Sequence, residues 1–566
     1  MKSCRIIYLF VLLIFGCKKS PSPFVPETPV KSSIATNGMV VSAHPLATAV
    51  GVSILKQGGN AVDAAIAVQF ALAVCYPVAG NLGGGGFMVV RTSDGKVDAL
   101  DYREVAPASS HRDMYLDSLG NALTDLSQNG HLAAGVPGTV AGLAASFKKY
   151  SQLKNWQLLV QPAIDMAWYG IALTEREAKN LNEQRALFDK VNTQPSAFVS
   201  RNWKEGDILI QSDLAETLER IKGQGRDGFY KGITAQKMVE EMERGKGIIT
   251  LSDLSRYEAK WRIPLSTTYR GYKIHSMPPP SSGGVALIQL LKSVEPFSLS
   301  EMPYHGDEMV HLMAESERRV YADRASYLGD ADFFPVPVRE LTDSQYIASR
   351  MKDFDTLMAT PSSAVKAGDI VNEHEQTTHI SIVDKDGNAV AVTTTLNGAY
   401  GSSVVVGGAG FLLNNEMDDF SIKPGVANLY GLIGAEANKI EPGKRMLSSM
   451  TPTIVEKNKS LFMVVGTPGG STIITSVFQA LVNVIDYGMD AATAVAKPRF
   501  HHQWKPDSIM VERGGLDSTV MINLKQKGHK FKERKPFGRV EAIIVLPNGQ
   551  LQGGADPRGD DHAMGY

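Results

Sequence analysis

The stretch Glu375-Gln376-Thr377-Thr378-His379-Ile380, continued by SIVDKDGNAVAVTTTLN over residues 381–397, predicts a β-hairpin. Alternating and β-branched side chains indicate strands at 379–383 and 389–395. The loop between them, Lys385-Asp386-Gly387, has its glycine at the position that favours left-handed dihedrals. A hairpin centred on Asp386 places Thr377 directly opposite Thr395, with both side chains on one face.

This face of the hairpin is rich in polar side chains. Thr393, Thr395 and Asn397 share it, because side chains along a strand alternate with a period of two residues. If the register holds, Thr395 can hydrogen-bond to Thr377. A bulge would shift the register by one residue and remove the pairing. A second interpretation stays open from periodicity alone, namely a threonine-rich strand that follows ordinary β-propensity.

A glycine turn is the second candidate element of a site. Residues 466–471 (GTPGGS) lie between a strand predicted at 461–465 and a helix predicted at 472–487, with Ser471 as the candidate N-cap. Backbone N–H groups at a helix start attract negative charge, and glycine lets a substrate approach them closely. Gly469 and Gly470 therefore have the geometry of an oxyanion hole for acyl transfer. Turns of this kind are also common as purely structural links.

Several motifs resemble, in the same order along the chain, those of the γ-glutamyltransferases (γ-glutamyl transpeptidases), which are N-terminal-nucleophile hydrolases. The resemblance covers residues 36–566 and implies an α+β fold, a four-layer αββα sandwich. The matching stretches are residues 80–87 (GNLGGGGF), 101–104 (DYRE), 135–139 (GVPGT), 278–284 (PPPSSGG), 376–379 (QTTH), 413–420 (LNNEMDDF), 447–450 (LSSM) and 468–471 (PGGS).

The resemblance implies self-cleavage between Gln376 and Thr377. Inside a chain, threonine is a weak nucleophile because no base lies beside its hydroxyl. Once it is N-terminal, its own α-amine, with an ordinary pKa of ~7.7–8.0, can take the proton. Cleavage would give a large subunit (36–376) and a small subunit (377–566) that stay together as an interwoven heterodimer. Thr395 would hydrogen-bond the nucleophile or its amine, and Gly469 and Gly470 would hold the oxyanion.

The resemblance also implies how a γ-glutamyl group is held. Arg103 would bind the α-carboxylate, because a guanidinium fork matches a carboxylate. Ser448 and Ser449 would assist it, and the α-ammonium group would be received by Asn397, Glu416 and Asp419. The expected donors are glutathione and other γ-glutamyl compounds. The expected acceptors are water, amino acids and peptides, and no cofactor is expected.

These polar residues also have ordinary interpretations. Arg103-Glu104 could be a structural ion pair, Asp418-Asp419 a solvated turn, and Ser448-Ser449 an ordinary loop. The glycine-rich residues 425–445 predict a long surface loop. This loop resembles a lid that closes the glutamyl pocket with an aromatic, here Tyr430. Relatives that act on cephalosporin-type amides lack that lid. Met446 stands where the family pattern has proline, which predicts a less rigid exit from the lid.

The N-terminus predicts export. Lys2 and Arg5 precede an apolar core at 6–15 that is too short to cross a bilayer. Residues 1–16 resemble a bacterial lipoprotein signal peptide, which makes Cys17 the expected lipidation site; a plain signal peptide is the alternative. Residues 17–35 are then a lipidated tether. We expect a lipid-anchored protein on a bacterial membrane, facing the periplasm or the outside.

Other classes of site find little support. His374, Glu375 and His379 lack the spacing of a zinc helix, and the sequence predicts no metal site. Gly83 to Gly86 lack the lysine of a phosphate loop and are expected to mark close backbone packing. A net charge of −1 does not suggest nucleic-acid binding.

The coarse secondary structure fits this reading. Helices are predicted at 47–57, 60–76, 161–169, 214–221 and 309–327, and strands begin at Phe87. Cys75 is expected to be buried in the second of these helices. Two alternative functions remain. One is an amide acylase of the same fold, and the other is a catalytically inactive lipoprotein that binds γ-glutamyl compounds.

Overall fold

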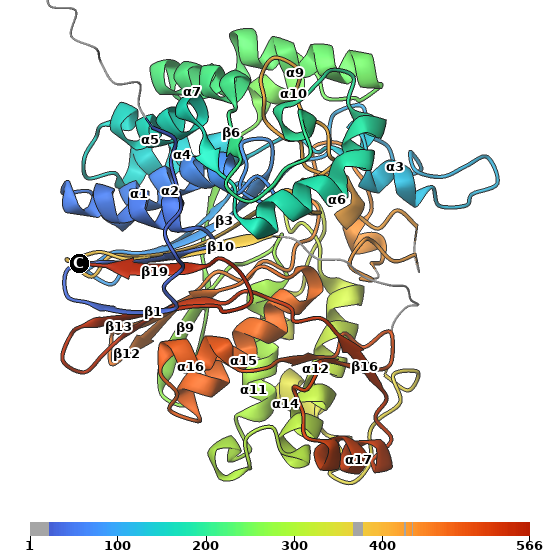
Figure 1. Cartoon of the computed structure of the whole chain (residues 1–566). Helices are drawn as coiled ribbons and strands as arrows, with labels where there is room; N and C mark the ends of the chain where they lie inside the picture. Colours follow the sequence, from blue (N-terminus) through green and yellow to red (C-terminus); the bar gives the residue numbers. More distant parts are fainter. Residues whose placement is uncertain (1–21, 366–376, 424–425, 433) are drawn as a thin grey trace, which may run out of the picture.

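Two seven-stranded antiparallel sheets lie face to face, and helices cover the outer face of each sheet (Figure 1). The computed structural model describes residues 22–365, 377–423, 426–432 and 434–566. An apolar layer that includes Val41, Val89, Ala391, Ile454 and Val464 fills the space between the sheets. The arrangement confirms the predicted α+β fold with four αββα layers.

The first sheet carries the predicted hairpin at its centre. Its strands, in order across the sheet, are β19 (His562–Gly565), β2 (Met39–Ser42), β10 (Thr378–Val383), β11 (Ala389–Thr395), β3 (Gly85–Arg91), β4 (Val97–Asp101) and β7 (Lys260–Arg262).

The second sheet packs against the first mainly through β13 and β17, which lie over β10 and β11. Its strands, in order, are β1 (Ser32–Ala35), β18 (Leu551–Ala555), β17 (Glu541–Val545), β13 (Ser460–Gly466), β12 (Thr453–Lys457), β9 (Tyr272–Ser276) and β8 (Leu265–Tyr269). Both sheets combine strands from before residue 377 with strands from after it.

The helices form two outer layers that agree with the predicted positions (Figure 1). Over the first sheet lie α1 (Pro45–Lys56), α2 (Ala61–Cys75), α4 (Thr139–Tyr150), α5 (Trp156–Tyr169) and α7 (Ser212–Gln224). Against the second lie α11 (Gly283–Val294), α12 (Asp307–Tyr327), α15 (Ile473–Ile485) and α16 (Ala491–Ala496).

Helix α2 illustrates why these segments are helical. Its start is fixed by a capping box, in which the Asn60 side chain accepts from the Asp63 N–H (2.9 Å) and Asp63 accepts from the Asn60 N–H (3.1 Å). All of its residues are buried, including Cys75, as predicted. A helix that is apolar all round belongs inside a large protein.

The hairpin of β10 and β11 has the predicted register. Thr378 pairs with Thr394 and His379 pairs with Thr393, so the numbers centre on Asp386. Gly387 has a φ of 82°, the left-handed conformation that the loop requires. No bulge interrupts this strand pair, so the face that carries Thr377 and Thr395 is continuous.

Gly83 to Gly86 mark close packing of the backbone, as expected. A Cβ on Gly83 would lie 2.1 Å from the carbonyl oxygen of Leu412, and one on Gly84 would lie 2.1 Å from that of Thr395. The run leads into β3, which pairs with β11 along its length. Glycine therefore allows the central strands to approach the loops that carry the site residues.

The predicted tether overlaps the folded body. β1 lies within residues 17–35 and pairs with β18 at the edge of the second sheet. Phe24 also forms a bridge with Ile171. The part of the tether nearest the body is therefore built into the fold. Cys17 lies outside the described residues.

Candidate active site

Thr377 lies just before β10, at the end of the hairpin nearest the loops. Only 4% of its surface is exposed, and its Oγ is 3.5 Å from the Oγ of Thr395. The predicted contact between the two threonines is thus present. Gln376, the other side of the predicted cleavage site, lies outside the described residues.

The next residue on the same face, His379, is locked between the two sheets. Its Nδ1 lies 2.8 Å from the Oγ of Thr393, and its Nε2 lies 3.2 Å from the Oγ of Ser381. Burial lowers the pKa of His379 to about 3, so the ring stays neutral in the physiological range. A Cβ on Gly466 would meet this ring at 2.2 Å, so glycine is required on β13 for the sheets to close over it. His379 is therefore a packing residue behind the nucleophile.

The glycine turn lies beside Thr377, between β13 and α15. Gly469 has a φ of 140° and Gly470 a φ of 51°, both in the region that favours glycine. Among the described residues, neither backbone N–H has an acceptor. Two free N–H groups at a helix start are what an oxyanion requires.

The N-cap prediction for Ser471 is wrong. A short 3-10 turn, Gly470–Thr472, precedes α15, and Ser471 lies inside that turn. Its Oγ donates to Gln503 Oε1 at 2.9 Å instead of capping the helix. The hydroxyl of Thr472 bonds back to the Gly469 carbonyl at 2.8 Å. This bond tightens the turn, so the side chain that closes it belongs to Thr472, one residue after Ser471.

Arg103 follows β4 and is the centre of a buried ion-pair group. Its Nη1 lies 2.5 Å from Glu416 Oε2, and its Nη2 lies 2.5 Å from Asp419 Oδ2. Glu104 Oε2 lies farther, at 3.6 Å. We call these four residues the Arg103 cluster. The structure thus brings together the residue predicted to bind a carboxylate and two of those predicted to bind an ammonium group.

The Arg103 cluster has more acidic than basic groups. Burial raises the pKa of Glu416 and of Asp419; Arg103, joined at Asp419 by Arg324, only partly opposes this effect. Burial also raises the pKa of Glu104 to about 7. Three buried carboxyl groups around one guanidinium are undercompensated. A further cation that entered here would be stabilised.

The remaining predicted residues line the same cavity as Thr377. Asn397 has a φ of 75°, and its side chain donates to the Asn415 carbonyl at 3.0 Å. Ser448 Oγ accepts from the Met450 N–H at 3.1 Å. Ser449 Oγ accepts from Arg324 at 3.0 Å. The cavity is lined by Arg103, Arg324, Thr377, Thr395, Asn397, Glu416, Asp419, Tyr430, Leu432, Ser448, Ser449, Met450, Gly470 and Ile473.

Arg324 was missed by the sequence analysis. It comes from α12, is buried, and also donates to Ser282 Oγ at 2.9 Å. Burial lowers its pKa, although the charge of Asp419 partly opposes this. It places a second guanidinium beside the serines. No local motif surrounds it, so only the packing of α12 reveals it.

Tyr430 covers the cavity that contains Thr377. Its hydroxyl donates to the Asn397 carbonyl, and its ring occupies the space that a Cβ on Gly470 would need, with a contact of 2.4 Å. The cavity beneath has a volume of only 20 Å³, about the space of one water molecule. A larger group can therefore enter only if the Tyr430 segment moves.

The exit of this segment is firmly packed. Met446 is fully buried, and its carbonyl accepts from Arg103 Nε at 3.3 Å. Burial and this hydrogen bond hold Met446 in place, and the lower rigidity expected at this position stays a prediction.

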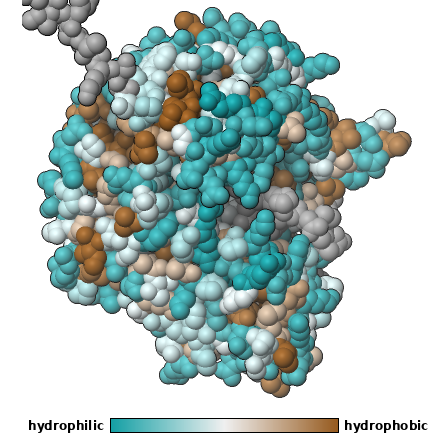
Figure 2. Space-filling view, viewed as in Figure 1, coloured by the Kyte–Doolittle hydropathy of each residue, from teal (hydrophilic) through white to brown (hydrophobic). Residues whose placement is uncertain are grey.

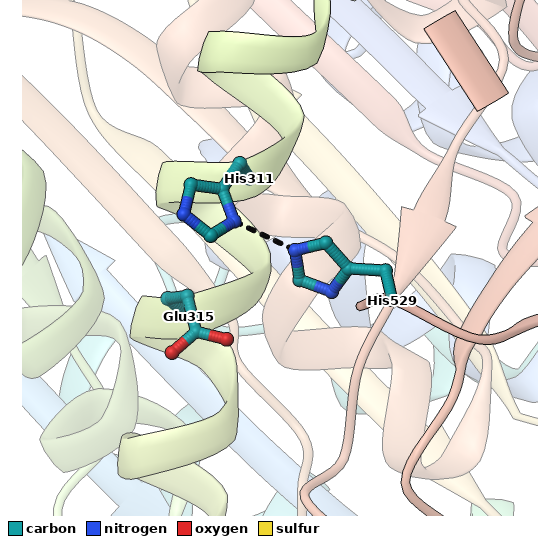
Figure 3. Close-up of side chains that lie close together, drawn as sticks. All are labelled: His311, Glu315 and His529. Atoms are coloured by element: carbon teal, nitrogen blue, oxygen red, sulfur yellow. Dashed lines mark hydrogen bonds between the residues drawn. The ribbon is translucent and has the colours of Figure 1, made fainter. Parts of the chain in front are cut away.

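A second group of titratable residues lies away from Thr377, on α12 and before β16 (Phe531–Arg534). His311 Nδ1 faces His529 Nε2 at 2.7 Å, with Glu315 one turn along the helix (Figure 3). Three such side chains can hold a metal ion. Here, Glu315 instead bonds to Arg319 Nη1 at 2.6 Å and to Arg318 Nε at 3.1 Å. His311 Nε2 lies 2.7 Å from the Asp355 carbonyl. Hydrogen bonds thus account for Glu315, for both ring nitrogens of His311 and for Nε2 of His529, whereas Nδ1 of His529 has no hydrogen-bond partner among the described residues.

Comparisons with known proteins agree with this geometry. The Gamma-glutamyltranspeptidase family model matches residues 47–566. The glutathione hydrolase proenzyme of Escherichia coli (strain K12) is 47% identical over 547 residues, covering 94% of this chain and 92% of the relative. The structure of Helicobacter pylori gamma-glutamyltranspeptidase has a TM-score of 0.56 at 44% identity, covering 61% of this chain and 97% of that one. The cephalosporin acylase of Bacillus halodurans has a TM-score of 0.82 at 26% identity, covering 98% and 99%.

Proposed function

The chain belongs to the gamma-glutamyltranspeptidase family, and we propose that it is an autoprocessed glutathione hydrolase and γ-glutamyltransferase. The observation that carries this function is the meeting of three elements at one cavity. They are the Thr377–Thr395 pair, the glycine turn and the Arg103 cluster. Together they supply a nucleophile, an oxyanion site and groups of both charges for a zwitterion.

The first step is self-cleavage. The Oγ of Thr377 attacks the carbonyl carbon of Gln376, and the peptide nitrogen leaves as the new α-amine of Thr377. Water then hydrolyses the resulting ester and frees the hydroxyl. The products are a heavy fragment that ends at Gln376 and contains the large subunit 36–376, and the small subunit 377–566, held together by the shared sheets.

Catalysis uses the same hydroxyl on an external amide. The α-amine of Thr377 takes the proton, and the Oγ attacks the γ-carbonyl carbon of the substrate. Gly469 and Gly470 hold the oxyanion, and the leaving amine takes the proton as the C–N bond breaks. Water, or the amine of an amino acid or peptide, then releases the γ-glutamyl group from the ester.

The γ-glutamyl group is recognised at its α-carbon. Arg103, with Ser448 and Ser449, binds the α-carboxylate, while Asn397, Glu416 and Asp419 bind the α-ammonium group. Arg103 is paired with both acids, so the substrate must enter between them and exchange partners. The ammonium group then adds the positive charge that the acidic cluster lacks.

The acylase alternative is weaker. Identity to the glutathione hydrolase proenzyme is 47%, against 33% to the Acylase ACY 1 proenzyme of Pseudomonas sp. (strain V22). Tyr430 also covers the cavity in the manner expected for a γ-glutamyl pocket. A binding protein without catalysis would have no use for an N-terminal nucleophile beside free N–H donors.

The location of the protein is a separate proposal. The signal-like residues 1–16 support export and a lipid anchor at Cys17, on a bacterial membrane with the enzyme facing the periplasm or the outside. Among the described residues, no helix is both long and apolar enough to span a bilayer. Replacement of Cys17 by alanine should move the protein from the membrane fraction to the soluble fraction. Unchanged membrane association would contradict the anchor.

The proposed function is tested by intact mass and one assay. The purified protein should give two fragments, the lighter one beginning at Thr377, and should hydrolyse γ-glutamyl-p-nitroanilide. An uncut chain that stays inactive after long incubation would overturn the enzyme assignment and favour the binding protein.

A further inference from the structure

A second cavity also reaches Thr377. It has a volume of 180 Å³, and Thr377 is the one described residue that lines both it and the closed cavity. Gly469 lines this second cavity, whereas Gly470 lines the closed one. The two proposed oxyanion donors therefore stand on the boundary between the two spaces. If a substrate's carbonyl carbon were held between these donors, the groups on either side of that carbon would lie in different cavities.

The second cavity continues along α6 (Glu175–Val191). A larger space of 490 Å³ shares Asn180 with it and is lined by Lys535, next to Pro536 in the second cavity. We call the two spaces together the α6 groove. Arg176 and Lys535 at its rim are exposed. Figure 2 shows mainly hydrophilic side chains on this side of the molecule, where Figure 1 places α6. The α6 groove is thus open and polar, unlike the cavity under Tyr430.

One face of α6 forms a wall of this groove. Arg176, Asn180, Gln184 and Leu187 line it at the spacing of successive helical turns, and Glu183 lines the larger space, away from the cavity that Arg176 borders. Side-chain amides of this kind pair with peptide groups, which have both a donor and an acceptor. The face therefore suits an extended peptide better than a compact amino acid.

Arg176 is the arginine of this groove with the fewest partners. Among the described residues its ion-pair partner is Asp560, 3.7 Å from its Nε, and the Arg176 side chain is 50% exposed. Such a pair is weak. The other two arginines are engaged: Arg539 with Asp561 at 2.9 Å, and Arg558 with Glu512 at 2.6 Å. None of the described residues lining the second cavity is acidic.

We propose that the α6 groove binds the leaving group and then the incoming acceptor, with Arg176 holding the acceptor's C-terminal carboxylate. This inference rests on the proposed function. The leaving group of glutathione is a dipeptide with a free carboxylate, and acceptors share that chemistry. In transfer, the acceptor nitrogen attacks the ester carbonyl carbon, the new C–N bond forms and the bond to Thr377 Oγ breaks. The proton passes from nitrogen through the α-amine to Oγ. The length of the groove favours peptides over free amino acids as acceptors.

The test compares two acceptors that differ only in charge, glycylglycine and glycylglycine amide, with γ-glutamyl-p-nitroanilide as donor. In the wild-type protein, kcat/KM should be higher for the carboxylate form. In Arg176→Ala this preference should fall about tenfold, the effect of one charge-assisted hydrogen bond. Arg176→Lys should restore part of it.

Lys190→Ala is the matched control, because Lys190 is an exposed cation on the same helix, and neither it nor its ion-pair partner Asp125 lines the α6 groove. It should keep the wild-type preference. An unchanged preference in Arg176→Ala, or equal slowing with both acceptors, would overturn the assignment of Arg176. Absence of anilide hydrolysis in the wild-type protein would instead contradict the proposed function, so the two failures are distinguishable.

Discussion

The Arg103 cluster and a second charged group on α12 are both buried, yet they differ in charge balance and surroundings. The second group, the α12 cluster, consists of His311, Glu315, Arg318 and Arg319. There, Glu315 is shared by two arginines, and Asp353 pairs with Arg319 at 2.9 Å. The Arg103 cluster has three carboxyl groups around one arginine and borders a cavity with the nucleophile. Burial and charge therefore do not mark a catalytic site by themselves; an unbalanced charge next to a reactive group does.

The largest effect should come from changing Thr377, the nucleophile, which lies beside the Arg103 cluster and not beside the α12 cluster. Thr377→Ala removes the attacking hydroxyl, so the chain should stay uncut and γ-glutamyl-p-nitroanilide hydrolysis should fall by about 10⁴-fold or more. Intact mass and initial rates measure both. Thr377→Ser keeps the hydroxyl and should be cut and active at a reduced rate. Normal cleavage in the alanine variant would show that another residue attacks.

The Arg103 cluster should affect activity more than stability. Arg103→Lys keeps the positive charge but loses the fork that binds a carboxylate, so kcat/KM should fall about 100-fold or more. The midpoint of urea unfolding should move little, because the lysine still places a positive charge beside the three acidic neighbours. A normal kcat/KM with a large loss of stability would make this cluster a second structural ion-pair group.

The α12 cluster should behave in the opposite way. Glu315→Gln leaves Arg318 and Arg319 short of a buried partner, so the free energy of unfolding should fall by about 2–4 kcal/mol. The activity of the folded protein should stay close to that of the wild type. Urea unfolding followed by fluorescence, beside the anilide assay, separates the two effects.

The stability difference between the wild type and Glu315→Gln should depend on pH in a defined way. Burial alone would raise the pKa of Glu315, but Arg318 and Arg319 together outweigh it and hold the pKa below its ordinary value. The stabilisation from a lowered pKa is present above the unfolded pKa of about 4.3 and is lost as the pH falls through the folded pKa. The stability difference between wild type and Glu315→Gln should therefore be constant near neutrality and shrink in acid. A difference that grows in acid would contradict the ion pairing.

The smallest effect should come from chelation. Because Glu315 is engaged by two arginines and His311 by a backbone carbonyl, EDTA should change neither the melting temperature nor the activity. Differential scanning fluorimetry with and without added Zn²⁺ checks this. A loss of stability that zinc restores would show that His311, Glu315 and His529 form a metal site.

The sequence predicts the parts of the site that depend on local spacing. Asp386 and Gly387 set the hairpin register, and that register places Thr377 opposite Thr395. The family motifs name Arg103, Glu416 and Asp419, which do lie together. The sequence could not predict the contacts that depend on packing between distant segments. Arg324 reaches Ser449 only because α12 lies beside that loop, and His311 meets His529 across 218 positions of sequence. Neither contact has a local pattern.

The mixing of strands from before and after residue 377 in both sheets has a consequence for how the molecule can refold. Once the chain is cut there, each half supplies strands that fill gaps in the sheets of the other. A denatured precursor could refold alone, at a rate independent of its concentration. Denatured mature protein would have to find its other half again, so its recovery would be second order and fail on dilution. The mature enzyme therefore keeps a fold that was formed by the uncut precursor.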